Sequence, residues 1–218
     1  MPFSSVLGAS SVIKPGVCTS TTRPSVPYEG QLIYETDTDR VASYNGSAWV
    51  YTHSSGLVVV KSETAFSTAS SVTADGVFTS SYTNYMVIVR YETNTTNSVF
   101  FKLRVSASSA STNYNYQTLA ASDTTLAGAR STSQTSAFAG TYTNGAFPSL
   151  ITMTLCGPQL AASTQFSAVD SHNLGAFTAI RYGTTVGNHS TATAYDGIEL
   201  LVTSGTMTGS YTIYGYSK

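Results

Sequence analysis

The sequence predicts an all-β protein, and three observations lead to this fold class. Short apolar or alternating runs recur roughly every 8–15 residues, separated by clusters of Gly, Asn, Asp and Ser. No segment carries apolar residues at helical spacing for more than a turn or two. Hydrophobic residues make up 41% of the 218 positions, which is enough to build a folded core. We therefore expect an antiparallel, jelly-roll-like β-sandwich preceded by an extended N-terminal arm and a small three-stranded β-meander.

The first 20 residues show no periodicity, and we expect them to form the extended arm. Such a segment is poorly ordered by itself, so its apolar side chains indicate docking onto another protein. The alternative is a frayed terminus without a partner. We expect no secretory signal, because the segment lacks a basic start followed by a long apolar run. The candidate docking residues are Phe3, Val6, Leu7, Val12 and Ile13.

The sequence of residues 21–53 predicts the three-stranded β-meander. Pro24 and Pro27 keep the residues before them extended, which excludes a helix at its start. An alternating run follows, then a polar turn, a second strand and the turn Asn45-Gly46, whose residue types suit a tight hairpin. The predicted strands are 31–35, 40–44 and 48–51.

A meander of this size is marginal in water. We therefore expect it to pack against the following domain or against copies of itself. The side chains proposed for this contact are Tyr28, Leu32, Ile33, Tyr34, Tyr44 and Trp49.

The stretches 22–24, 28–40 and 44–49 together resemble a cassette found in structural proteins of tailed bacteriophages, among them tail fibres, minor tail proteins and head fibres. The segment 205–216 is similar to the closing hairpin of β-rich domains in the same proteins. The resemblance implies a trimeric virion component with no enzymatic activity, and it does not distinguish between tail and head.

Residues 57–218 show the strand and turn spacing of an all-β sandwich or barrel. Eight to eleven antiparallel strands indicate a jelly roll, in which two paired sheets protect their edges. Two of the strands, 85–92 and 99–105, should form a hairpin. The full predicted set is 57–61, 72–78, 85–92, 99–105, 114–119, 137–142, 150–155, 165–169, 176–182, 197–202 and 210–216.

The composition argues against several kinds of partner. The net charge is −1 and no basic stripe is present, so we expect neither nucleic acid nor an anionic membrane surface as a partner. No apolar run approaches the roughly 18 residues that a membrane span needs, so we expect no membrane insertion. The two cysteines, Cys18 and Cys156, are interpreted as reduced thiols, which fits assembly in a bacterial cytoplasm.

Catalytic and metal-binding patterns are weak. Asp170, Ser171 and His172 are adjacent, and neighbouring residues of a strand point to opposite faces, so they do not predict a triad. The three histidines have no ligand spacing. We expect no catalytic residue, metal or cofactor.

One acidic cluster combines Glu35, Asp37 and Asp39. Carboxylates at this spacing could offer oxygen ligands to Ca²⁺. They are equally typical of a solvated hairpin turn, and this is our interpretation.

The fifteen tyrosines are the remaining candidates for core or ligand-binding positions. Tyr85, Tyr91 and Tyr182 lie within predicted strands and are expected in the core. The run Tyr114-Asn115-Tyr116 is a candidate glycan contact, because aromatic rings stack on sugars and amides bind hydroxyls. The alternative is an ordinary strand edge.

The function predicted from these observations is a non-enzymatic structural component of a tailed phage virion. A trimeric tail-associated fibre or receptor-binding protein that contacts host-surface glycan is the first hypothesis. A head fibre or capsid decoration (cement) protein held by its N-terminal arm is the second. A carbohydrate-active enzyme domain is a remote third, and it requires two carboxylates in one groove. The expected partners are further copies of the chain and other virion proteins of the tail or capsid.

Overall fold

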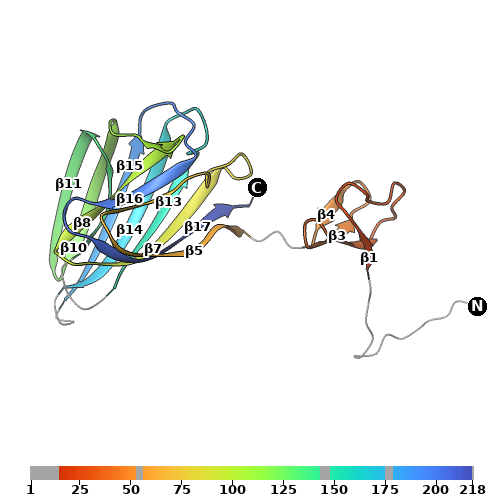
Figure 1. Ribbon diagram of the computed structural model, residues 1–218, viewed down its shortest axis with the longest axis horizontal. Coiled ribbons are helices and arrows are strands. Elements are labelled where there is room, and N and C mark those ends of the chain that lie inside the picture. The colour runs from red at the N-terminus through yellow and green to blue at the C-terminus, as the bar shows by residue number, and fades with distance from the viewer. Residues whose placement is uncertain (1–14, 53–55, 143–147, 175–178, 218) are drawn as a thin grey trace, which may run out of the picture. The chain divides into compact units, whose positions relative to one another are not determined.

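The computed structural model describes residues 15–52, 56–142, 148–174 and 179–217 (Figure 1). These residues form strands, turns and loops, and the predicted all-β class is confirmed. None of them belongs to a helix long and apolar enough to cross a membrane. The chain divides into two compact units, 1–55 and 56–218, which are described separately. The five apolar residues proposed for the arm, from Phe3 to Ile13, lie outside the described residues.

The N-terminal unit contains one four-stranded sheet in the order β1-β2-β3-β4. Its last three strands are the predicted antiparallel meander. The prediction that residues 1–20 form only an extended arm is wrong at its end, because β1 pairs with β2 in parallel. Thr36 N extends this pairing by donating to Cys18 O at 2.9 Å. The strands are β1 (Gly16–Cys18), β2 (Leu32–Glu35), β3 (Arg40–Tyr44) and β4 (Trp49–Tyr51).

A buried carboxylate joins the loops of this unit to its sheet. Glu35 is fully buried, and its Oε1 accepts from Arg23 Nε at 2.5 Å. Its Oε2 accepts from Thr38 Oγ1 and from Tyr51 Oη, each at 3.0 Å. The bond from Arg23, followed by those from Tyr51 and Thr38, holds the pKa of Glu35 below its ordinary value against the opposing effect of burial. The interpretation of Glu35 as a solvated turn residue was therefore wrong, because four segments of the unit meet at this one side chain.

The residues proposed for contacts of the meander fall into different environments. Ile33 is buried and belongs to the core of the unit. Tyr28 and Leu32 are exposed. The rings of Tyr44 and Trp49 lie 5.5 Å apart and contact each other.

The N-terminal unit should lose stability in acid. Because the pKa of Glu35 is lower in the folded unit, its contribution is present above pH 4.5, the ordinary value, and is lost as the pH falls through the lower folded value. Glu35→Gln should destabilise the unit by about 3 kcal/mol at pH 7, at the low end of the range for breaking a buried ion pair because Arg23 stays partly solvated. Urea unfolding followed by the fluorescence of Trp49, the chain's one tryptophan, measures the stability of this unit.

The matched control is Glu29→Gln, which neutralises an exposed carboxylate of the same unit. It should leave the urea midpoint and its acid dependence near those of the wild type. Equal midpoints for the Glu35 and Glu29 variants would contradict the role of the buried carboxylate.

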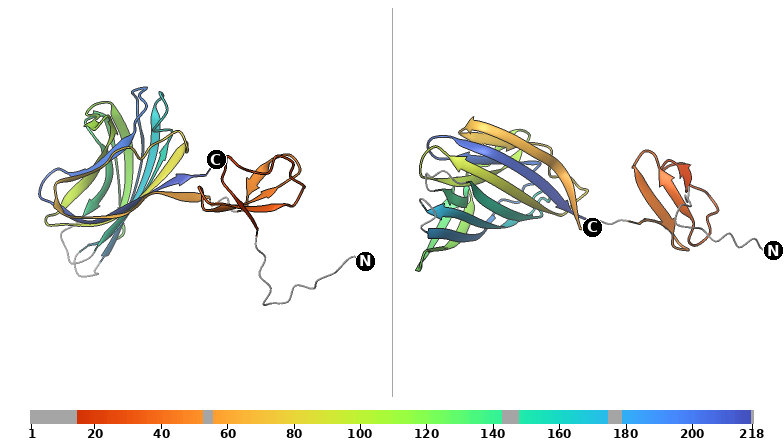
Figure 2. Two further views of the ribbon diagram at one scale, coloured as in Figure 1. Left: turned by 45° about the vertical axis from the view of Figure 1, so that its right-hand side comes forward. Right: turned by 90° about the horizontal axis from the view of Figure 1, so that it is seen from below.

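Unit 56–218 is a sandwich of an eight-stranded and a five-stranded sheet (Figures 1 and 2). All pairings within it are antiparallel in the described residues, as predicted. The larger sheet has the order β11 (Thr125–Gln134), β10 (Tyr114–Ser122), β15 (Ala179–His189), β14 (Thr164–Leu174), β13 (Ser149–Cys156), β7 (Asn84–Thr93), β17 (Met207–Tyr216) and β5 (Leu57–Ala69). The smaller sheet has the order β12 (Ala137–Tyr142), β8 (Asn97–Val105), β16 (Gly197–Val202) and β6 (Ser71–Ala74), with β9 (Ser108–Ser109) paired to β8.

The core lies between the two sheets and follows from the alternation of the strands. Every second residue of β7, β13 and β8 is buried, so each of these strands contributes one face to the core. Tyr85 and Tyr91 are among the buried side chains, as expected. The core is one continuous cluster that also includes Phe101, Leu103 and Ile151.

Most predicted strands are present, with differences at particular places. Residues 75–78 of the predicted strand 72–78 are not in a strand. The predicted hairpin of 85–92 with 99–105 is wrong, because β7 and β8 belong to different sheets. The prediction 176–182 begins outside the described residues, and β15 continues seven residues beyond its end. β11 was not predicted, and all of its residues except Ser131 are exposed. A strand with solvent on both faces has no apolar alternation to reveal it.

Tyr114 links the two sheets. It is fully buried, and its hydroxyl accepts from Leu103 N of β8 at 2.7 Å. Its ring contacts Phe101 from the smaller sheet and His189 from the larger one. Burial raises the pKa of the Tyr114 hydroxyl. This residue is therefore part of the core.

Removing the Tyr114 hydroxyl should destabilise the sandwich. In Tyr114→Phe the buried N–H of Leu103 loses its acceptor, which costs about 1–3 kcal/mol. Tyr116→Phe is the matched control, since the structure gives the Tyr116 hydroxyl no hydrogen bond within the described residues. Urea unfolding followed by circular dichroism measures both, and equal midpoints would contradict the linking role.

Candidate binding groove

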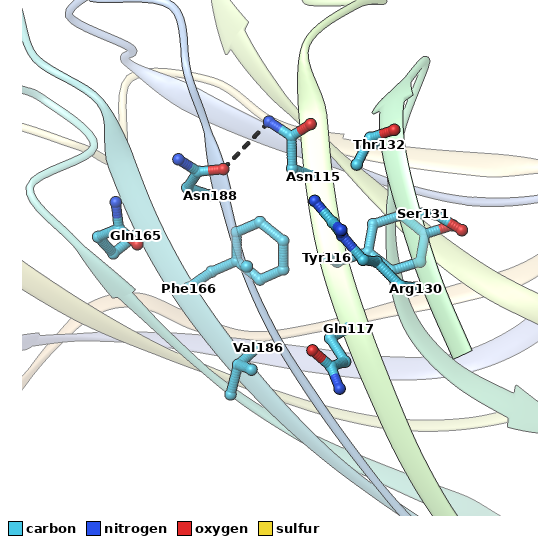
Figure 3. Close-up of a pocket in the computed structure, with 11 residues that line it drawn as sticks. Asn115, Tyr116, Gln117, Arg130, Ser131, Thr132, Gln165, Phe166, Val186 and Asn188 are labelled. Carbon is cyan, nitrogen blue, oxygen red and sulfur yellow. Dashed lines mark hydrogen bonds between the residues drawn. The ribbon is translucent and has the colours of Figure 1, made fainter. Parts of the chain in front are cut away.

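An open groove of about 450 Å³ lies on the outer face of the eight-stranded sheet, over β10, β11, β14 and β15. The register places its polar side chains next to one another. Asn115 is opposite Asn188, which is opposite Gln165, and Gln117 is opposite both Val186 and Arg130. Figure 3 shows Asn115 and Asn188 at one end of the groove, and Gln117 and Val186 at the other.

A β-bulge shapes one end of the groove. The pairing of β10 with β11 shifts between Tyr114 and Tyr116, and the intervening Asn115 stabilises the shift. Its Oδ1 accepts from Ser133 N at 3.0 Å, where Ser133 has a φ of 54°. Its Nδ2 donates to Asn188 Oδ1 at 3.2 Å. Asn115 therefore fixes the shape of the groove and orients the Asn188 amide.

Gly187 is required at the centre of the groove. A Cβ atom at this position would lie 2.2 Å from the backbone oxygen of Asn115 and 2.6 Å from Cζ of Phe166. Backbone at such a distance cannot yield to a side chain, so only glycine lets β10 and β15 approach here. The Phe166 ring occupies the space that a Cβ at position 187 would need, and it packs against Phe101 in the core.

The groove offers donors and acceptors without a negative charge. The side chains of Gln117, Arg130 and Gln165 have no hydrogen-bond partner within the described residues. Arg130 is the one ionised side chain among the described lining residues. Amides both donate and accept, while a guanidinium only donates. This set suits a hydroxyl-rich ligand that is neutral or anionic.

The predicted glycan-contact residues do not act as a group. Tyr114 is in the core and is unavailable to a ligand. Asn115 and Tyr116 both line the groove. The Tyr116 ring stacks on Phe138 with centroids 6.4 Å apart, on the opposite side of β10 from Asn115. The alternation that suggested stacking on a sugar instead directs both aromatic rings toward the sandwich interior.

The sequence reasoning missed most of the groove. Arg130 lies on the unpredicted strand β11, and Gln165 and Asn188 come from β14 and β15. Only the register brings these strands beside β10, and a single sequence does not reveal which strands pair.

The three carboxylates of the acidic cluster have separate hydrogen-bond partners. Asp37 accepts from Ser20 N and Oγ, and Asp39 accepts from Tyr34 Oη at 2.7 Å, so neither points to the buried Glu35 site. Within the described ranges, no group of three His, Cys, Asp or Glu residues is suited to hold a metal ion.

Two further sets of ionisable groups occupy structural positions in the sandwich. Asp170 and His172 share the inner face of β14 and Ser171 lies on the other face, as the sequence predicted. Asp170 Oδ2 lies 3.3 Å from Arg181 Nη1. On the smaller sheet, Arg104 Nε donates to Asp75 at 2.6 Å, and this bond raises the pKa of Arg104.

The remaining histidine is also structural. His189 is fully buried, its Nδ1 lies 3.1 Å from Tyr195 Oη, and burial lowers its pKa. His53 lies outside the described residues. Both cysteines have free thiols; Cys156 is exposed and Cys18 is half-buried.

Comparison with known proteins adds no relative. The chain matches no protein-family model, no curated protein and no solved structure.

Proposed function

We propose that this protein is a non-enzymatic structural component of a tailed phage virion, displayed as a trimer, whose sandwich binds host-surface glycan through the groove. The observation that carries the proposal is the groove itself. Three polar side chains that have no hydrogen-bond partner among the described residues surround an open surface whose one ionised side chain there is Arg130. This is the chemistry of a binding site for sugar hydroxyls.

The groove favours binding over hydrolysis. A glycosidase needs two carboxyl groups on either side of the scissile bond. All eleven Asp and Glu residues belong to the described part of the chain, and none lines the groove. The carbohydrate-active enzyme alternative therefore has no support at this site.

The division into two units supports separate attachment and display. The N-terminal unit carries the segments that resemble phage cassettes, and it has its own buried Glu35 network. The sandwich carries the groove. We propose that the first unit joins the virion and that the second is exposed to the host.

Immunogold electron microscopy of particles from the phage or prophage that encodes this chain tests the proposal. With antibody against residues 57–218, label is expected at the tail tip or baseplate. Label spread over the head would replace the receptor-binding function with capsid decoration. Absence of the chain from purified particles by mass spectrometry would contradict the virion function.

Arg130→Ala should weaken glycan binding. Losing a hydrogen bond from a charged donor costs about 1.5–3 kcal/mol, which corresponds to roughly a tenfold or greater loss of affinity. The readout is binding of the full chain to immobilised host-surface polysaccharide. Arg90→Ala is the matched control, because Arg90 is exposed on β7 of the same sheet and does not line the groove. Equal binding by the two variants would exclude the groove as the glycan site.

A further inference from the structure

Six large apolar side chains are exposed together on the outer face of the eight-stranded sheet. Their exposed fractions run from 39% for Val169 to 73% for Leu126. One of them, Tyr182, was expected in the core and is 50% exposed. We call this set the apolar patch; its members are Leu119, Leu126, Leu150, Val169, Ile180 and Tyr182.

The register makes the apolar patch continuous. One row across the sheet runs from Leu126 through Ala121, Tyr182 and Ser171 to Leu150, over five neighbouring strands. The next row contains Leu119, Thr184 and Val169. Neighbouring strands lie about 4.8 Å apart, so these side chains form one surface.

The groove begins one row further along the same strands. Gln117 and Val186 form that row, and both line the groove. The outer face of the sheet thus has an apolar half and a polar half that share a border.

The apolar patch is large enough to form a substantial part of a protein–protein interface. Fully burying an aliphatic side chain removes roughly 60–120 Å² of apolar surface from water. Six half-exposed side chains therefore offer roughly 200–350 Å². One partner of a standard-size specific interface buries about 800 Å², and about 65% of a homodimer interface is apolar. The patch supplies roughly half of that apolar area, and the alanine and threonine residues between its members add to it.

The charge of the surface favours a second copy as the partner. None of the residues in the two rows is ionised between Leu126 and Leu150, and the charged residues at the border of the patch are Arg90, opposite Leu150, and Asp123, whose N donates to Ile180 O. A neutral surface offers no charge pairing to select a foreign protein. Each copy brings the same surface, so the apolar patches of all copies can meet around the axis of a closed cyclic assembly.

The exposed edge strand β11 also favours a second copy of the chain as the partner. β11 pairs only with β10 and is exposed on both faces, and its only charged side chain is Arg130. Monomeric proteins commonly protect such an edge with lysine, proline or a covering segment. Leu126 connects this open edge to the apolar patch.

From this geometry we infer that the sandwich packs against further copies of this chain through the apolar patch, with the groove at the rim of the subunit interface. The inference rests on the proposed function only for the number of copies, which is three. It places a self-association surface on the sandwich, in addition to the contacts proposed for the N-terminal unit.

Light scattering on the full-length chain after gel filtration tests the inference. The wild type should have three times the mass of the 22.9 kDa chain at micromolar concentration. Leu119→Lys and Val169→Lys each place a charge in the patch and should weaken association at least about tenfold. Val59→Lys is the matched control, because Val59 is a more exposed valine on β5, at the far edge of the same sheet.

A wild type that stays at 22.9 kDa would overturn the inference. So would patch variants that keep the wild-type mass on dilution, or a Val59 variant that dissociates as readily as they do. Circular dichroism identifies any variant that fails to fold, and the other patch variant then decides. Particle labelling and glycan binding are measured independently, so failure of the proposed function is distinguishable from failure of self-association.

Discussion

The larger sheet of the sandwich extends beyond the smaller one at β11, and the proposed contact surface includes this open edge. Within the described residues the smaller sheet ends at β12, which packs against β14 and β15. β11 is consequently exposed on both faces, and Tyr114 on β10 is the residue that ties this margin to β8. β11 contributes no buried side chain to the core, whereas its neighbour β10 contributes Tyr114.

The same alternation that builds the core divides the outer face into two parts. Inward positions of β10, β14 and β15 carry Tyr114, Phe166 and His189. Outward positions of these strands carry amides at one end, beside Arg130 of β11, and mainly aliphatic side chains at the other. Gly187 and the bulge at Asn115 hold the strands close enough to form the groove. Ligand binding and self-association would then share a border at Val186, which makes the groove sensitive to assembly.

The all-β class and most strands could be predicted from the sequence, because buried strands alternate and turns use Asn-Gly or Asp-Gly. The errors have physical causes. Tyr182 lies in a strand, but the residues around it do not indicate which face is buried. Glu35 alternates correctly with Ile33, yet its burial depends on Arg23, twelve residues earlier. The groove combines residues from four strands whose pairing depends on the whole fold.

Hydroxyl-radical footprinting of the full-length chain at high and low concentration tests the central claim most directly, which is that the outer face of the eight-stranded sheet is the contact surface. Labelling of Leu119 and Tyr182 should fall as concentration rises, while Leu160, exposed on a loop between β13 and β14, should keep its labelling. Labelling of all three that does not change with concentration would contradict the account.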